Sequence, residues 1–232
     1  MIPQWDEWLT EEINDNASYV DKYEEAEQLL LSGTRRAVVM CIKNVPFERS
    51  ADVHISAVLP IQDRAFYLIN RGDVKNLSLL GESHIIYYTH ESIPTYIRDF
   101  NDKVQLVKVE ELNDSYEYII TNQASQEAIQ LDPHEFIPEV GEGIYVVLCK
   151  SDDIDFRQKL ISSHVEKVMQ LSNLQRGISY ELKELEIIGI YVHRDSNGNL
   201  HGSMAYKDDE LKYISYSQST SHEFVRNFIS QM

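Results

Sequence analysis

The chain has 232 residues, of which 43% are hydrophobic and 25% charged, so it has enough apolar material to fold around a core and is neither disordered nor fibrous. Its 38 Asp and Glu residues outnumber its 21 Lys and Arg residues, which gives a formal net charge of −17. Phosphate backbones and anionic membranes repel such a surface, so direct binding to nucleic acid or to a membrane is not expected.

The first 32 residues are predicted to be helical and acidic, with nine carboxylates against one lysine. Trp5, Leu9 and Ile13 recur at helical spacing and should form one apolar stripe. A second helix is expected to begin at Ser18, because an acidic residue follows it three positions later as in a capping box. Gly33 is expected to end that helix.

Short apolar or alternating runs then predict β-strands over 37–42, 53–59, 65–69, 83–89, 104–109 and 116–121. Helices are expected over 73–80, 93–100 and 125–131. The strand over 116–121 is expected to pair with the strand over 104–109, because only a short polar turn separates them.

The second half begins with a predicted buried strand over 144–149 and a long helix over 151–175 that ends at Gly177. A three-strand meander over 184–192, 200–206 and 211–215 and a closing helix over 221–231 follow. The predicted class is therefore α+β, with mainly antiparallel sheets, an acidic N-terminal helical segment, a long central helix and a C-terminal helix. We expect a single compact unit over 1–232, or two lobes over 1–138 and 144–232.

Cys41 and Cys149 each end an apolar run, so both are expected to be buried free thiols, as is usual in a reducing cytosol. A single disulfide is the alternative, because the two runs could be neighbouring strands. The start of the chain lacks the pattern of a signal peptide, and no stretch is apolar enough for a membrane span. These features predict a cytoplasmic protein.

The eight histidines raise the question of a metal site, but no His-Glu-x-x-His or Cys-x-x-Cys motif occurs. A two-residue turn at Asn197-Gly198 would pair Arg194 with His201. His193 and His201 would then lie on opposite faces of the hairpin, where they could not share an ion. No metal ion and no other cofactor is expected.

No nucleophile elbow and no phosphate-binding glycine motif is present, and the Gly141-Glu-Gly143 run precedes a strand instead of following one. The sequence therefore assigns no catalytic residue. If the protein is an enzyme, the first residues to test are His84, His90, Cys149 and His193.

The leading interpretation is a non-catalytic protein that binds another protein with a basic surface, as an accessory subunit, an immunity-type neutraliser or an inhibitor. The residues expected to bind this partner lie in the acidic N-terminal segment: Trp5, Trp8, Glu11, Glu12, Asp15, Glu24 and Glu25. Three alternatives remain open: a nucleic-acid mimic that inhibits a DNA-binding protein, an enzyme whose site is not visible in one sequence, and a structural component of a larger assembly. A homo-oligomer is compatible with each of them.

Overall fold

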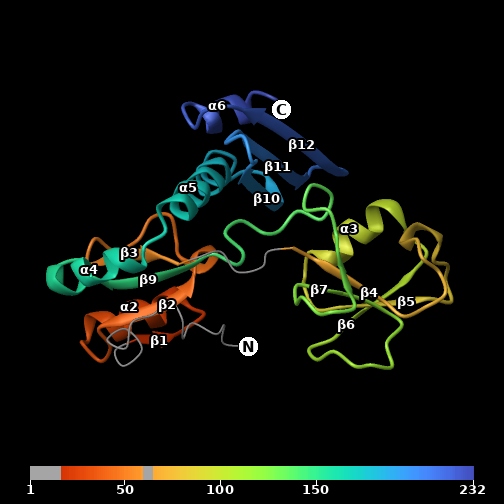
Figure 1. Cartoon of the computed structure of the whole chain (residues 1–232), viewed down its shortest axis with the longest axis horizontal. Coiled ribbons are helices and arrows are strands. Elements are labelled where there is room, and N and C mark those ends of the chain that lie inside the picture. The colour runs from red at the N-terminus through yellow and green to blue at the C-terminus, as the bar shows by residue number, and fades with distance from the viewer. Residues whose placement is uncertain (1–16, 60–64) are drawn as a thin grey trace. The chain divides into compact units, whose positions relative to one another are not determined.

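A computed structural model describes residues 17–59 and 65–232. The described residues form two compact units, each built from two stretches of sequence. Unit 1 contains residues 17–59 and 141–180, and unit 2 contains residues 65–140 and 181–232. Helices and strands are mixed in the chain, and most strand pairings are antiparallel (Figure 1). The predicted α+β class with mainly antiparallel sheets is thus confirmed.

Unit 1 is organised around a four-stranded sheet in the order β1-β2-β9-β3. Its strands are β1 (Ala17–Tyr19), β2 (Ala37–Cys41), β3 (Val53–Val58) and β9 (Tyr145–Lys150). β1 runs parallel to β2, whereas β9 is antiparallel to both β2 and β3. All residues of β2 are buried, and a strand that is covered on both faces needs an uninterrupted apolar run.

Helices cover both faces of this sheet. α2 (Tyr23–Leu31) and α5 (Glu166–Glu181) join the core on the side of Val38, and a short 3-10 turn, η1 (Ile42–Asn44), follows β2 on the same side. α4 (Ile154–Leu160) buries Phe156 against the side of Val39. Neighbouring residues of β2 therefore serve two separate cores.

The second helix begins later than the sequence predicts. Ser18 lies in β1, where its hydroxyl accepts a hydrogen bond of 2.6 Å from Arg35 Nε, so it is not an N-cap. The helix that follows, α2, begins at Tyr23. Its end is as predicted, because Gly33 takes the left-handed conformation with φ of 73° just beyond the last turn.

The predicted helix over 151–175 is two helices, α4 and α5, with a 3-10 turn, η3 (Ile161–Ser163), after the first. The break has a clear cause: the backbone N–H of Val58 donates to His164 Nδ1, and the N–H of Val165 donates to the Val58 carbonyl. Residues that complete strand β3 in this way cannot also continue a helix. α5 runs past Gly177, so that residue does not end it. No helix in the ranges 17–59 and 65–232 is both long and apolar enough to cross a bilayer.

Cys41 and Cys149 lie in neighbouring strands without pairing. In the ladder of β2 and β9, Ala37 lies opposite Cys149, whereas Cys41 lies opposite Tyr145. The two thiols are therefore at opposite ends of the ladder, too far apart for a disulfide. Both cysteines are free and buried, as predicted.

Unit 2 contains a five-stranded mixed sheet in the order β6-β5-β7-β4-β8. Its strands are β4 (Tyr67–Asn70), β5 (Ile85–Tyr88), β6 (Gln105–Lys108), β7 (Tyr118–Thr121) and β8 (Ala128–Gln130). The predicted pairing of 104–109 with 116–121 is wrong: β5 lies between these strands and is parallel to both, because helix α3 (Ile93–Phe100) carries the chain across to a parallel neighbour. The predicted helix over 125–131 is strand β8, and 73–80 forms only the 3-10 turn η2 (Leu77–Leu79).

The predicted meander is confirmed as a three-stranded antiparallel sheet of β10 (Glu186–Arg194), β11 (Leu200–Lys207) and β12 (Leu211–Gln218). Helix α6 (Phe224–Ile229) covers one of its faces (Figure 1). A Cβ atom added at Gly202 would lie 2.9 Å from the rings of both Phe224 and Phe228. The glycine therefore allows α6 to pack closely on β11, while Ala205, on the other face of the meander, joins the hydrophobic core of unit 2.

Candidate functional site

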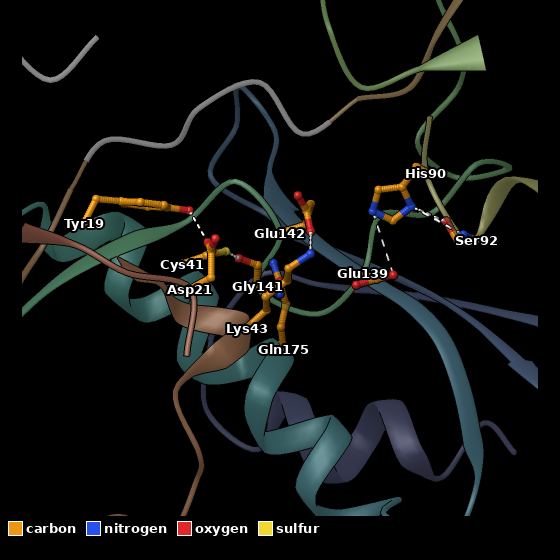
Figure 2. Close-up of polar contacts among 10 residues, drawn as sticks. All are labelled: Tyr19, Asp21, Cys41, Lys43, His90, Ser92, Glu139, Gly141, Glu142 and Gln175. Atoms are coloured by element: carbon orange, nitrogen blue, oxygen red, sulfur yellow. Dashed lines mark hydrogen bonds and ion pairs between the residues drawn. The ribbon is translucent and has the colours of Figure 1, made fainter. Parts of the chain in front are cut away.

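Polar residues gather in unit 1 where β1 and β2 end. Because these strands are parallel, the chain leaves both at the same edge of the sheet, which is the edge where open α/β sheets bind ligands. The loop before β9 carries Gly141 and Glu142 to the same edge (Figure 2), since the next residue of the ladder, Tyr145, pairs with Cys41. We call this group the strand-end site, and its members are Tyr19, Asp21, Cys41, Lys43, Gly141, Glu142 and Gln175.

The site contains one pair of opposite charges. The ammonium of Lys43, in η1, lies 2.5 Å from a carboxylate oxygen of Glu142 (Figure 2). Their side chains are 31% and 17% exposed, so a solute can reach both charges. Glu142 stands between Gly141 and Gly143, which both take the left-handed conformation, with φ of 75° and 68°. A left-handed residue on each side sets the direction of the Glu142 side chain.

Helix α5 holds both loops of the site in place. Gln175 is fully buried, and its side-chain oxygen accepts a hydrogen bond of 3.3 Å from the backbone N–H of Gly141. The guanidinium of Arg176 donates at 2.8 Å to the carbonyls of both Ile42 and Val45. One helical turn thus fixes the loop that carries Lys43 and the loop that carries Glu142.

The thiol of the site is not a nucleophile at neutral pH. Cys41 is buried and donates to the Gly141 carbonyl at 3.4 Å, and burial raises its pKa to about 11. The hydroxyl of Tyr19 donates to Asp21 at 2.7 Å, and burial raises the pKa of this phenol as well. The strand-end site is therefore equipped to bind charged groups and not to attack them through a thiolate.

The histidines singled out from the sequence lie in unit 2. His84 Nδ1 accepts a hydrogen bond of 3.0 Å from the N–H of Gly81, so it closes a turn. His90 Nδ1 lies 2.9 Å from the hydroxyl of Ser92, and its Nε2 lies 3.8 Å from the carboxylate of Glu139 (Figure 2). Both histidines thus have local partners within their own unit.

The other two candidates have different surroundings. Cys149 is buried, its sulfur lies 2.8 Å from the hydroxyl of Ser56, and burial raises its pKa. It is a packed side chain of the sheet. His193 is buried enough for its pKa to be lowered, and its Nδ1 has no hydrogen-bond partner among the described residues.

The predicted placement of His193 and His201 is wrong. The register pairs His193 directly with His201, and the two rings stack. The turn is longer than two residues because the Asp195 carboxylate accepts hydrogen bonds from the backbone of both Asn197 and Asn199 and holds the residues between the strands out of the ladder. A loop of this length shifts the pairing, so both imidazoles lie on one face.

His201 also links two polar groups on that face. Its Nε2 lies 3.1 Å from the Asp195 carboxylate, and its Nδ1 lies 2.8 Å from the hydroxyl of Ser217. An ionised carboxylate only accepts, so the ring proton belongs on Nε2 and Nδ1 accepts from the serine. The hydrogen bond from Asn199 and the contact with His201 lower the pKa of Asp195, which keeps this carboxylate ionised at neutral pH.

Most residues of the predicted partner-binding set lie outside the described part of the chain: Trp5, Trp8, Glu11, Glu12 and Asp15. The remaining two, Glu24 and Glu25, are exposed in the first turn of α2, on the opposite side from its buried residues Tyr23 and Ala26. Acidic side chains at that end favour the helix, which is a sufficient reason for their position.

The sequence-based interpretation missed the strand-end site. Its signals were the polar residues Lys43 and Asn44 directly after a fully apolar strand, and an acid between two glycines at 141–143. The second signal does not fit a phosphate-binding glycine motif, so the sequence alone assigns it no role. Polar residues at the end of a strand indicate a binding site only when a second element reaches the same edge of the sheet. Here only the pairing of β2 with β9 shows that it does.

No protein-family model matches the chain. A search of curated proteins gives 29% identity over 182 residues to a "Probable porphobilinogen deaminase" of Sulfurisphaera tokodaii. The match covers 73% of this chain and 60% of that protein, so the chain spans about three fifths of its relative's length.

Three solved structures are similar to parts of the chain at low TM-scores. YhfZ from Shigella flexneri has a TM-score of 0.36 and 17% identity, over 68% of this chain and 79% of that one. The VFT2 domain of BvgS from Bordetella pertussis has a TM-score of 0.32 and 14% identity, over 62% and 67%. A substrate-binding protein of an amino acid ABC transporter has a TM-score of 0.28 and 11% identity, over 69% and 74%. At such scores none of these likenesses supports a function for this chain.

The similarity to a deaminase corrects the leading interpretation of the sequence. The relative is named for its action on a small molecule, not for binding another protein. The prediction of a non-catalytic accessory subunit, neutraliser or inhibitor is therefore wrong, and the nucleic-acid mimic and the structural component fall with it. The error came from treating the net charge as evidence of function. A negative surface promotes solubility whatever the protein does.

Proposed function

We propose that this chain binds porphobilinogen, or a pyrrole of the same chemistry, at the strand-end site of unit 1. The observation that carries the proposal is the 29% identity over 182 residues to a protein named as a deaminase of porphobilinogen. The relative is longer, so its whole activity is not transferred to this chain. Recognition of the small molecule is the part that the strand-end site supports.

The charges of the strand-end site complement those of this compound. Porphobilinogen is a pyrrole that carries two carboxylate side chains and one aminomethyl group. The Lys43 ammonium can pair with a carboxylate, and the Glu142 carboxylate can pair with the protonated amine. In the absence of a ligand the two side chains pair with each other, which keeps both charges satisfied and in position.

The rigidity of the site also favours binding. Gln175 and Arg176 hold the loops of Glu142 and Lys43 through hydrogen bonds to the backbone. A site that is already in place loses little conformational entropy when a ligand arrives. The ring of Tyr145, tilted by 47° to that of Tyr19 at a centroid distance of 6.2 Å, adds an apolar surface on which a pyrrole can lie.

Isothermal titration calorimetry with porphobilinogen tests the proposal. The wild-type chain should bind, and Lys43→Gln and Glu142→Gln should each weaken binding roughly tenfold, because each removes one charge-assisted contact. Lys167→Gln is the matched control, since this exposed lysine lies on α5 and not in the site. A pyrrole dicarboxylate without the aminomethyl group should bind Glu142→Gln at least as tightly as the wild type, because it has no amine with which the Glu142 carboxylate could pair.

Two results would overturn the proposal. One is no measurable heat with the folded wild-type chain at millimolar porphobilinogen. The other is equal affinity of wild type, Lys43→Gln and Glu142→Gln, which would place any binding elsewhere. Release of ammonia from the bound compound, measured in the same samples, shows whether binding leads to turnover.

A further inference from the structure

Unit 2 contains a cavity of about 380 Å³ that the proposed function does not use. It lies between helix α3, the loop that follows β8 and strand β12. Four aromatic rings, two carboxylates and one imidazole line it: Tyr96, Phe100, Phe136, Tyr213, Asp99, Glu135 and His134. The volume is typical of small-molecule sites, and no lysine or arginine is among the lining residues.

The aromatic part of the cavity is well fixed. The ring of Tyr96 is buried, and its hydroxyl donates to the Ile137 carbonyl at 2.6 Å, so it needs no further partner. The Phe136 ring packs against it at a centroid distance of 5.7 Å. The Phe100 ring meets Phe136 edge to face at 6.3 Å and is itself 42% exposed, so it lies at the rim.

The formal negative charges in the lining are the carboxylates of Asp99 and Glu135. The hydroxyl of Tyr213 donates a hydrogen bond to Asp99, and burial together with the charges of Asp99 and Glu135 raises the pKa of this phenol to about 12. A second negative charge is thus disfavoured at this position. The same field stabilises a positive charge, and so do the faces of aromatic rings.

We propose that this cavity is a binding site for a small organic cation, an amine or quaternary ammonium whose apolar part packs on Tyr96, Phe100 and Phe136 while its charge faces Asp99 and Glu135. Aromatic rings accept the weakly hydrated alkyl surface of such a cation, and the carboxylates supply the long-range attraction. An anion or an uncharged polar solute gains neither contribution. The site is independent of the strand-end site, since every lining residue belongs to unit 2.

Choline and its uncharged isostere, in which a carbon atom replaces the nitrogen, are the probes for this proposal. Calorimetry with the full chain should show binding of choline, and the isostere should bind about tenfold more weakly, because it has the same shape without the charge. The methyl protons of bound choline should shift upfield in the NMR spectrum, since they lie over aromatic rings.

Single-residue variants distinguish the contribution of the carboxylate to choline binding from that of the aromatic rings. Asp99→Asn and Phe100→Leu should each reduce the affinity for choline several-fold, and both residues are exposed enough for the fold to tolerate the change. Asp102→Asn, an exposed carboxylate just beyond α3 and outside the lining, should bind choline as the wild type does. Lys43→Gln should also bind choline normally, which distinguishes failure here from failure at the strand-end site.

Equal affinity for choline and its isostere would overturn the proposal and leave a merely apolar cavity. So would an absence of choline binding and of any upfield shift at high millimolar concentration with the folded chain. Binding that survives both Asp99→Asn and Phe100→Leu unchanged would place the cation elsewhere.

Discussion

His193 of β10 lies directly opposite His201 of β11, and their imidazole rings stack with centroids 5.1 Å apart and an angle of 17° between their planes. On the same face the ring of Tyr191 stacks on His193 at 5.1 Å, and that of His134 meets it edge to face at 5.3 Å. A protonated His193 would therefore have to share a crowded, partly buried place with two other imidazoles.

This crowding predicts a pH dependence of stability. Burial and then the neighbours His134 and His201 lower the pKa of His193 from 6.5 in the folded chain. The unfolded chain consequently binds more protons as the pH falls, so the free energy of unfolding should decrease between about pH 7 and pH 5. Urea unfolding at a series of pH values measures this slope.

His193→Phe tests the source of that slope. Phenylalanine keeps a ring in the stack but cannot be protonated, so the variant should lose less stability between about pH 7 and pH 5 than the wild type. His222→Gln, at an exposed histidine, is the control and should keep the wild-type slope. Identical slopes for wild type and His193→Phe would show that another group causes the loss.

Gly141→Ala should destabilise the chain by about 2 kcal/mol, because alanine is strained at a positive φ and cannot fit without movement here. The added Cβ would lie 2.7 Å from Ile42 Cγ2 at a φ of 75°. Gly81→Ala is the matched control, since nothing lies within 4 Å of its Cβ position. The free energies of unfolding of the two variants should differ clearly, and equal values would contradict the described loop.

Arg176→Met should reduce stability by about 1–3 kcal/mol, since it removes the guanidinium that donates to the carbonyls of both Ile42 and Val45. It should also weaken porphobilinogen binding, because the loop that carries Lys43 loses its anchor. Urea unfolding and calorimetry of one preparation measure both effects. Lys167→Met on the same helix should change neither, and a loss of binding in that control would point to a general disturbance of α5.

Both thiols should be unreactive in the folded chain. Burial raises the pKa of Cys41 to about 11, so almost none of this residue is thiolate at pH 8, and burial raises the pKa of Cys149 as well. A thiol reagent such as dithionitrobenzoate should label neither cysteine in the native protein and both after unfolding in urea. Rapid labelling of the native chain would show that one of these strands opens readily.

Local patterns in the sequence were sufficient for most of the regular elements. The buried runs of β2 and β9, the helix α3 and the meander β10–β12 follow from apolar periodicity and turn residues, which act over a few positions. The errors arise where a distant partner decides. His164 and Val165 complete β3 instead of a helix, and β5 separates two strands that are close in sequence.

The sequence by itself determined the class of the fold, the burial of Cys41 and Cys149 and most strand positions, because hydrophobic burial and backbone geometry depend on neighbouring residues. Only the tertiary structure decided which side chains meet. Lys43 and Glu142 are far apart in the chain and come together because β2 and β9 pair, just as Asp99 and Tyr213 meet only because α3 and β12 pack in the same unit. Strand register and crossover connections decide which distant side chains come into contact, and no local sequence pattern encodes these contacts.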